Sequence, residues 1–388
     1  MSGIAGDLEA RADKAAGARD FVTAEQLLSR AAMAGGQSVA LFMKLTAMRR
    51  GLGNLAGAIE ANKGALRIEP LGFMPLLMRA SLLQAAGRED EAAEAYAVAL
   101  HHAPPIGTLP PVVRAELDRA RAIADRHIAA QGASFAQLAA DAAPDASAAE
   151  ARRLGRFRSN VLRTTRAYAQ EPSHFHFPEL PVIEFFDRAH FPFFDALEAN
   201  AARIRAEFEM VMHAEAAELV PYVQYPDDVP LAQWAELNRN RQWTAIHLVR
   251  NGVVVEANAR HCPLTLSLFE AADQPQIAGR SPNLMFSLLA PRTHIPAHTG
   301  VANTRLVAHL PLIVPPGCRF RVGAETRDWV AGEAFAFDDT IEHEAWNDSD
   351  QLRVVLIGDL WRPELTPAER AAVTAIMAMP AGELDSIF

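Results

Sequence analysis

The pattern of side chains changes near the middle of this 388-residue chain, and this change constrains the fold more than any other feature. Residues 1–128 are rich in Ala, Leu, Glu and Arg and poor in β-branched residues, which is typical of helices. From about residue 283 the chain consists of short apolar runs separated by turn residues such as Pro315-Pro316-Gly317, which is typical of strands. We therefore predict a helical part followed by a β-rich part, within the two or three domains that the length allows.

A 34-residue period runs through the helical part. Alanines stand seven residues apart with one larger residue between them, as Ala24, Leu28 and Ala31; Ala58, Asn62 and Ala65; and Ala92, Tyr96 and Ala99. Small residues let two helices approach closely, and Pro70 and Pro104 can end a unit because proline does not continue a helix. The pattern resembles tetratricopeptide repeats, so we expect residues 1–128 to form an α-solenoid that holds a peptide or protein. A generic alanine-rich bundle stays open as an alternative, since Arg11 and Arg79 stand where these repeats usually have leucine.

The rest of the chain is expected to divide into two segments. Residues 129–155 are small, polar and alanine-rich, which indicates a linker with a helix. Residues 156–388 are expected to form one domain with a β core at about 240–362, arranged as a sandwich or barrel because short strands follow one another at roughly ten-residue spacing. Thr366 and Glu369 form a capping-box pattern, which predicts a C-terminal helix over 367–379.

The composition excludes several classes of function. A net charge of -10 argues against nucleic-acid binding, which requires a basic surface to meet phosphates. There is no signal-peptide pattern, and no apolar run approaches the roughly 18–20 residues that a membrane span requires. The two cysteines, Cys262 and Cys318, are interpreted as unpaired thiols. We therefore expect a cytoplasmic protein with neither nucleic acid nor membrane as a partner.

Two predicted strands place charged side chains where apolar ones are expected. Side chains alternate along a strand, so Arg305, Val307 and His309 share one face of theirs. Arg353 shares a face with apolar residues of the last predicted strand. A buried arginine needs a partner because an unpaired buried charge is costly. The residues alone leave two partners open, an anionic ligand or a protein carboxylate.

Two histidines in the β-rich part are candidate metal ligands. His298 stands in a predicted turn within Pro-Ala-His-Thr-Gly, and His343 stands about 45 residues later at the start of a predicted strand. Two imidazoles on adjacent strands are a common way to hold a divalent metal. Spacing by itself does not establish this role, since the chain has 13 histidines and most histidines are not ligands.

The stretch from Leu284 to Thr366 resembles the aspartyl/asparaginyl β-hydroxylase family of Fe(II)- and 2-oxoglutarate-dependent oxygenases. The resemblance rests on several blocks in order: MFSLLAP, THIPAHTG, NTRLVAHLPLIVPPGC, ETRDWVAGEAFAFDDTIEHEAWND and LRVVLIGDLWRPELTP. It implies a double-stranded β-helix (jelly-roll or cupin-like) catalytic domain. Tetratricopeptide-like repeats ahead of such a domain are a known arrangement in this family.

The resemblance implies a role for each candidate residue. His298 and His343 match the iron ligands, and Gly300 stands where related oxygenases carry a carboxylate, a departure that the family shares. Arg353 and Ser287 match the residues that hold the distal carboxylate of 2-oxoglutarate. Arg305 and His309 match residues near its other carboxylate. Asp338 and Asp339 are expected to form a turn or to support the ligands from behind, not to bind the metal directly.

The implied reaction is hydroxylation of a C–H bond with Fe(II), 2-oxoglutarate and O2 as cofactor and cosubstrates. For the family this is the β-carbon of Asp or Asn in a peptide or protein, which the repeat half could recruit. Two alternatives stay open: the same chemistry on a small-molecule or lipid acyl substrate, and a non-catalytic repeat protein carrying an inactive barrel.

Overall fold

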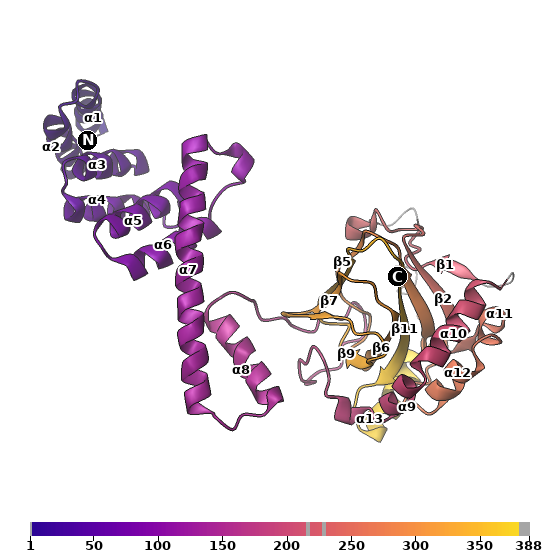
Figure 1. Ribbon diagram of the computed structural model, residues 1–388. Coiled ribbons are helices and arrows are strands. Elements are labelled where there is room, and N and C mark those ends of the chain that lie inside the picture. Colours follow the sequence, from indigo (N-terminus) through magenta and orange to yellow (C-terminus); the bar gives the residue numbers. More distant parts are fainter. Residues whose placement is uncertain (1, 215–217, 227–229, 380–388) are drawn as a thin grey trace. The chain divides into compact units, whose positions relative to one another are not determined.

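The computed structural model describes residues 2–214, 218–226 and 230–379 (Figure 1). The chain divides into two compact units, Met1–Thr164 and Thr165–Phe388. The first unit is helical and the second contains all the strands of the described residues, so the expected order of a helical part and a β-rich part is confirmed. Among the described residues no helix combines the length and the apolar character that crossing a membrane requires.

Unit 1 consists of helical hairpins followed by two further helices. The helices are α1 (Ser2–Gly17), α2 (Phe21–Met33), α3 (Val39–Gly51), α4 (Leu55–Ile68), α5 (Phe73–Ala85), α6 (Glu89–His101), α7 (Pro111–Ala142) and α8 (Ala148–Val161). Consecutive helices pack as pairs, α1 with α2, α3 with α4 and α5 with α6. The pairs correspond to the 34-residue period, so the chain begins with helical repeats.

The in-register small residues lie at the centre of these pairs. All six in-register alanines are buried, and so are the three larger residues between them. The polar member, Asn62, is satisfied because its side-chain amide donates to the carbonyl of Pro75 at 3.1 Å. Gly64 shows how closely the helices approach, since a Cβ there would lie 2.3 Å from the ring of Phe42.

The expected boundary at residue 128 falls inside a helix. Helix α7 continues without a break to Ala142, because residues 129–142 are mostly Ala, Gln, Leu and Phe and contain no proline. Helix α8 follows, with a capping box between Ser147 and Glu150. The expected linker at 129–155 is therefore largely helical, and the compact unit extends to Thr164.

Unit 2 contains two antiparallel sheets. Its strands are β1 (Leu219–Pro221), β2 (Trp243–Arg250), β3 (Val253–Val254), β4 (Leu284–Leu289), β5 (Thr293–His298), β6 (Arg305–Ile313), β7 (Cys318–Val322), β8 (Glu325–Asp328), β9 (Phe335–Phe337), β10 (His343–Asn347) and β11 (Arg353–Trp361). One sheet has the order β1-β2-β4-β11-β6-β9, with β3 beside β2, and the other has the order β5-β10-β7-β8. The sheets confirm a β domain over the expected core, and the finer double-stranded β-helix topology stays a prediction.

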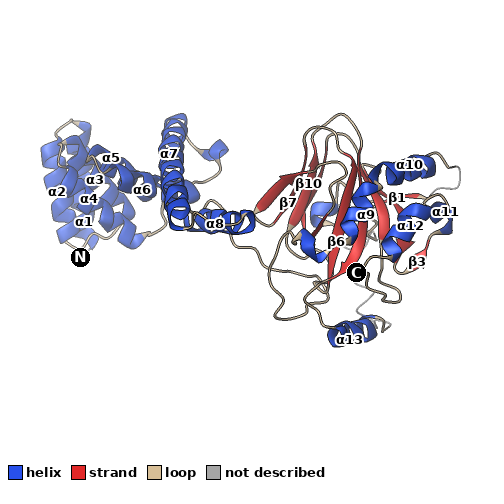
Figure 2. Cartoon of the chain, turned by 60° about the horizontal axis from the view of Figure 1, so that its bottom comes forward, coloured by secondary structure: helices blue, strands red, loops and turns tan. Residues whose placement is uncertain are grey.

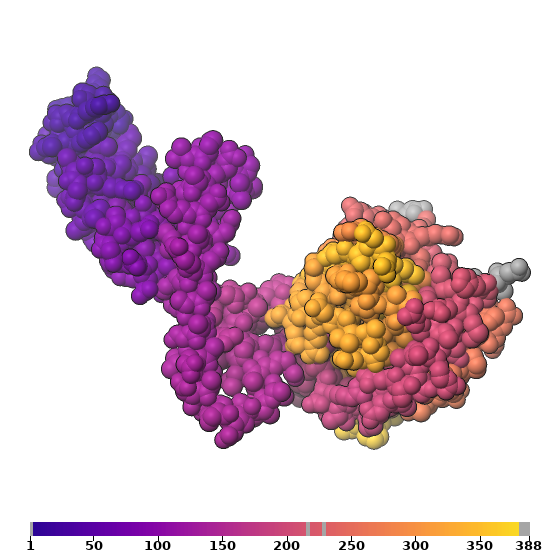
Figure 3. Space-filling view, viewed as in Figure 1, coloured from indigo at the N-terminus to yellow at the C-terminus, as the bar shows by residue number. Residues whose placement is uncertain are grey.

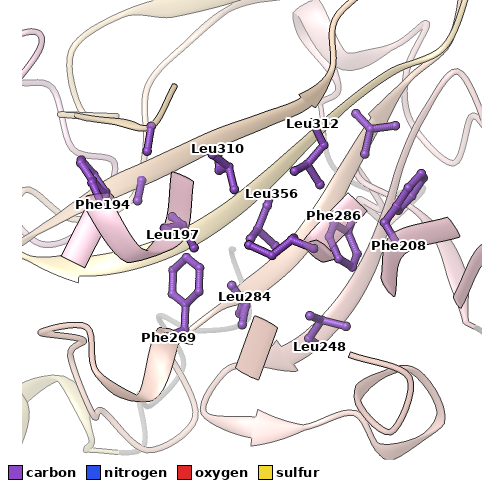
Figure 4. Packing of buried hydrophobic residues seen from close by; sticks show 14 of the residues in the cluster. Phe194, Leu197, Phe208, Leu248, Phe269, Leu284, Phe286, Leu310, Leu312 and Leu356 are labelled. Atoms are coloured by element: carbon purple, nitrogen blue, oxygen red, sulfur yellow. The ribbon is translucent and has the colours of Figure 1, made fainter. Parts of the chain in front are cut away.

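Helices cover the outer face of the larger sheet. They are α9 (Phe193–Ala199), α10 (Ala201–Met212), α11 (Glu256–Ala259) and α12 (Pro263–Glu270), which lie together along one side of the strands in Figure 2. In the space-filling view the rose-coloured α9 and α10 region lies directly against the orange and yellow strands (Figure 3). Leu310 of β6 and Leu356 of β11 belong to the same buried cluster as Phe194 and Phe208 of these helices (Figure 4). The residues between them in each strand must therefore face the other sheet.

The opposite face of the larger sheet meets the smaller sheet. Val307 of β6, Val355 of β11 and Phe320 of β7 belong to one apolar cluster that joins the two sheets. The predicted alternation along β6 and β11 is confirmed, because Leu306, Ala308 and Leu310 pack outward while Val307 packs inward. The C-terminal helix α13 (Pro367–Met377) begins at the expected capping box of Thr366 and ends two residues earlier than expected.

Residues 165–186, which we call the strap, run along unit 2 before its first helix. The strap makes backbone hydrogen bonds to two turns of the β domain, through Glu171 N to Thr340 O at 2.8 Å and Ser173 N to Gly300 O at 3.0 Å. Gln170 adds a side-chain bond of 2.7 Å to the carboxylate of Asp338. The strap thus holds together the two turns that adjoin His298 and His343.

Candidate active site

The two candidate metal ligands face each other at the edge of the smaller sheet. His298 ends β5, His343 begins β10, and they are register partners of these paired strands. Their ring centroids are 4.0 Å apart. Each Nδ1 lies against a backbone carbonyl two residues earlier, at 2.8 Å from Pro296 O for His298 and 3.1 Å from Ile341 O for His343. When Nδ1 donates its proton to that carbonyl, Nε2 keeps the lone pair that a metal requires.

Burial favours the neutral form of both imidazoles. It lowers the pKa of His298 to about 4 and the pKa of His343 well below its usual range, and for His343 the neighbouring His298 adds to the effect. A neutral imidazole is the metal-binding form. The pair therefore fits a divalent cation, although among the described residues no cluster of three or more His, Cys, Asp or Glu side chains could hold one.

Arg353 is a buried cation that lines the same cavity as the two histidines. It is among the largest fully buried side chains, and no ion pair to it occurs within the described part of the chain. Its Nε has no hydrogen-bond partner, and its guanidinium lies 4.4 Å from the ring centroid of Trp329. Burial lowers the pKa of Arg353 to about 9. Of the two partners left open by the sequence, an anionic ligand is the one that fits.

Ser287 and His309 lie near Arg353 on neighbouring strands. Ser287 is opposite Val355 of β11 and accepts a hydrogen bond of 3.1 Å from the indole Nε1 of Trp243. Its hydroxyl hydrogen is therefore free to donate. His309 is buried among aromatic rings, including Phe337 at 4.9 Å, and its Nδ1 has no partner. Burial and the charge of Arg353 hold the pKa of His309 well below its usual range.

Arg305 has a different environment from Arg353, although both face the same space. Its Nη2 donates to Asp339 Oδ2 at 3.0 Å, and its Nη1 lies 3.5 Å from Asp359 Oδ1. Burial opposes the charge of Arg305, but the two aspartates together raise its pKa. Burial raises the pKa of Asp339 to about 6 despite the attraction of Arg305.

Gly300 has no space for a side chain. A Cβ at Gly300 would lie 2.2 Å from Asp339 Oδ2, and Gly300 N donates to the backbone oxygen of Asp339 at 2.7 Å. The Asp339 carboxylate therefore occupies the place into which a carboxylate carried by residue 300 would project. Asp338 points elsewhere, into a fully buried pair with Arg362 at 2.6 Å.

All six predicted site residues line one cavity of about 630 Å3: Ser287, His298, Arg305, His309, His343 and Arg353. The structure adds residues that the sequence did not indicate. Tyr222 stacks on Trp243 at 3.9 Å, and Trp234 lies 4.9 Å from the His298 ring, so aromatic rings close one side of the cavity. These aromatic residues lie in or beside a segment without clear strand alternation, so the sequence pattern did not place them at the site. Asp359 lies within an otherwise apolar strand, and the pattern did not indicate its role either.

Comparison with known proteins agrees with this arrangement. Residues 198–363 match the aspartyl/asparaginyl β-hydroxylase family over both sheets and the helices α10, α11 and α12. The β domain belongs to the aspartyl/asparaginyl β-hydroxylase family. The match includes every residue of the cavity named above and leaves out unit 1 and the strap.

Several relatives carry this hydroxylase-family domain within different proteins. The aspartyl/asparaginyl β-hydroxylase of Mus musculus is 34% identical over 47% of this chain and 23% of its own length. The human aspartate β-hydroxylase domain-containing protein 2 is 33% identical over 55% of this chain and 57% of its own length. The ornithine lipid ester-linked acyl 2-hydroxylase of Rhizobium tropici is 36% identical over 47% of this chain and 62% of its own length. The chain thus spans less than two thirds of the length of these curated relatives, and their names differ in substrate.

Proposed function

We propose that the hydroxylase domain is an Fe(II)- and 2-oxoglutarate-dependent dioxygenase that converts a C–H bond of its substrate to C–OH. The observation that carries the proposal is Arg353, a buried arginine without a carboxylate partner, in the same cavity as two facing neutral histidines. An arginine in this state calls for an anionic ligand. A dicarboxylate could meet this arginine with one carboxylate and the metal with the other.

Different side chains would bind the metal and the cosubstrate. His298 and His343 would hold Fe(II) through Nε2, because their Nδ1 atoms are engaged by backbone carbonyls. Arg353 would bind the distal carboxylate of 2-oxoglutarate with its planar fork, and Ser287 would add its hydroxyl hydrogen. Bound Fe(II), 2-oxoglutarate and O2 together supply the oxidant.

The carboxylate nearer the metal is assigned to His309 and not to Arg305. The expectation from resemblance placed both residues near it. Arg305, however, is already paired with Asp339 and Asp359, whereas Nδ1 of His309 has no partner. Tyr222, Trp234 and Trp243 exclude water from the histidine side of the cavity, which strengthens the electrostatic interactions inside it.

The substrate proposed first is a peptide or protein, hydroxylated at the β-carbon of Asp or Asn. Support comes from the names of several relatives and from the helical repeats of unit 1, since such repeats commonly bind polypeptides. The tetratricopeptide character of the repeats and a role of unit 1 in recruitment are part of this proposal. A cytoplasmic location stays a prediction.

A lipid or small-molecule acyl substrate is the second candidate. The relative from Rhizobium tropici is named for an acyl 2-hydroxylase, and much of the cavity wall is apolar, with Met285, Ile295 and Ile357 among its residues. The full chain can be offered a peptide pool and an acyl-lipid pool in turn. A gain of one oxygen in mass spectrometry, confined to one pool, identifies the class.

The catalytic proposal is tested by product formation. The full chain, purified without oxygen and loaded with Fe(II), is expected to convert 2-oxoglutarate to succinate when O2 is admitted, even without primary substrate. Replacement of Arg353 by Met should abolish succinate formation, and replacement of the exposed Arg319 by Met should not. Metal-loaded protein that forms no succinate would instead support the non-catalytic alternative.

A further inference from the structure

We propose that the cavity accepts an uncharged carbonyl group of the substrate, such as the carboxamide of an asparaginyl side chain, and rejects a carboxylate. This inference rests on the proposed hydroxylase function and narrows its substrate class. It follows from the charges of the cavity and from the hydrogen-bonding groups that are left without partners.

The arginines that line the cavity differ in their partners and in their exposure to solvent. The lining arginines are Arg250, Arg305 and Arg353. Arg353 is the residue assigned to the cosubstrate, and Arg250 is exposed, so water weakens its attraction for an anion. Among the arginines of the described cavity lining, Arg305 is thus the one left to meet a substrate group.

Arg305 is more than neutralised by its neighbours. Asp339 and Asp359 flank its guanidinium at 3.0 and 3.5 Å, so these three side chains carry one negative charge in total when both aspartates are ionised. Asp359 is fixed in this position because its Oδ2 accepts hydrogen bonds of 2.8 Å from Ser281 Oγ and 2.8 Å from Asn283 N. An incoming carboxylate would approach a group of net negative charge. The charges of a divalent metal and a dicarboxylate cosubstrate cancel each other. The positive charge of Arg353 is engaged by the cosubstrate carboxylate assigned to it, so the group around Arg305 keeps its own negative charge.

The free hydrogen-bonding groups complement a neutral amide. Nη1 of Arg305 is a buried donor without a hydrogen-bond partner, and Oδ1 of Asp339 is a buried acceptor without one. A carboxamide has a carbonyl oxygen for the donor and an N–H for the acceptor. A carboxylate has acceptors only, so it would satisfy Arg305 and face Asp339 Oδ1 with a second negative charge.

In the part of the chain that the structure describes, the wall beside Arg305 is apolar. Val307 follows two residues later on the same face of β6, and Ile357 and Met285 face the cavity from β11 and β4. Apolar side chains at these positions do not solvate a buried carboxylate. They suit the carbon chain of an uncharged acceptor.

The test compares three capped amino acids of nearly equal size: N-acetylasparagine methylamide, the corresponding aspartate, and the β-methyl ester of that aspartate. Each is added to the Fe(II)- and 2-oxoglutarate-loaded full chain at pH 7.5, and succinate formation above the uncoupled rate is measured together with oxygen insertion. We expect the amide to exceed the carboxylate by at least about tenfold in kcat/KM. Activity with the ester as well as the amide would show that charge decides, and activity with the amide alone would show that the N–H is also recognised.

Replacing Asp359 by Asn tests the cause of the preference. The change removes one of the two negative charges beside Arg305. The affinity for the capped aspartate should therefore rise by at least about tenfold. Asp348 is the control, since it pairs with Arg319 at the surface and its change to Asn should not alter the preference.

Two results would overturn the inference while leaving the proposed function intact. One is uncoupled succinate formation with a carboxylate substrate used as well as the amide. The other is an affinity for the capped aspartate that is no higher in the Asp359→Asn protein than in the wild type. Absence of uncoupled succinate formation would instead refute the proposed function itself. If the variant does not fold, the comparison of the three compounds with the wild type decides alone.

Discussion

Gly300 and Asp339 form a matched pair at the level of single residues. The glycine stands where a related oxygenase would carry a carboxylate, and Asp339 fills the space that such a side chain would need. The pairing explains why a side chain at position 300 is excluded, and it relates two positions 39 residues apart. The sequence pointed to Gly300 as a departure from the usual pattern but did not indicate what replaces the side chain.

Replacement of Gly300 by Ala is expected to displace the Asp339 carboxylate. The added methyl group would overlap it, and overpacking of this kind costs about 1–3 kcal/mol of folding free energy. We expect urea unfolding to show this loss and succinate formation to fall with it. Gly155 is the control, because a Cβ there meets no atom within 4 Å and its change to Ala should not destabilise the chain.

Arg353 is expected to show opposite effects on stability and on ligand binding. Its replacement by Met removes a buried, unpaired charge, so the metal-free protein should become more stable by roughly 1–3 kcal/mol, the cost of leaving a buried polar group unsatisfied. Binding of 2-oxoglutarate, measured by titration calorimetry with an inert divalent metal, should be lost. A variant that is less stable than the wild type would show that Arg353 has a protein partner.

At the level of elements, the strap is the feature that the sequence left undefined. It lies outside the matched family region, yet it reaches the turns beside both candidate metal ligands. The centre of this contact is the buried pair of Asp338 and Arg362, to which Gln170 of the strap adds a hydrogen bond. Periodicity could not reveal it, because the strap has no regular secondary structure over most of its length.

Replacement of Asp338 by Ala should leave the charge of Arg362 without its buried carboxylate partner. Breaking a buried pair from one side costs about 3–5 kcal/mol, so unfolding should occur at much lower denaturant concentration. Metal affinity should also weaken, since the adjoining turn leads to His343. Replacing Asp348, which forms an exposed pair with Arg319, should cost no more than about 1 kcal/mol. Equal losses of folding free energy and metal affinity in the two variants would contradict the proposal that the buried Asp338–Arg362 pair, which the strap contacts, supports the turn before His343.

At the level of the whole molecule, the histidines of the cavity give unit 2 a characteristic response to acid. The pKa of His298, His309 and His343 lies below the usual value of 6.5 in the folded, metal-free protein. Between pH 6.5 and about 4 the unfolded chain therefore binds more protons than the folded chain. Stability is then fully present above pH 6.5 and declines as the pH falls.

Metal-free protein should accordingly unfold at lower urea concentration at pH 5 than at pH 7.5. Asp339 opposes this trend in part, because its raised pKa of about 6 makes the folded state take up one proton in the same range. Replacing His309 by Phe should reduce the difference between the two pH values. A difference unchanged by this variant would show that His309 does not contribute to the acid response.

Local patterns in the sequence determined the order of the two parts and the side-chain faces of the central strands. The 34-residue register placed the small residues that are buried in unit 1, and the two-residue alternation placed Arg305 and His309 on the inner face of β6. Such features follow from residues close in sequence. The resemblance to the hydroxylase family, not spacing, singled out His298 and His343 among the 13 histidines.

The tertiary structure alone decided which charges are paired. Arg305 and Arg353 both stood among apolar residues of predicted strands, yet Arg305 meets Asp339 and Asp359 while Arg353 meets no carboxylate in the described residues. The partners of Arg305 are 34 and 54 residues away, and the pairing depends on which strands become neighbours. Ion pairing falls off within a few ångströms, so it is determined by the packing of the sheets and not by the order of residues along the chain.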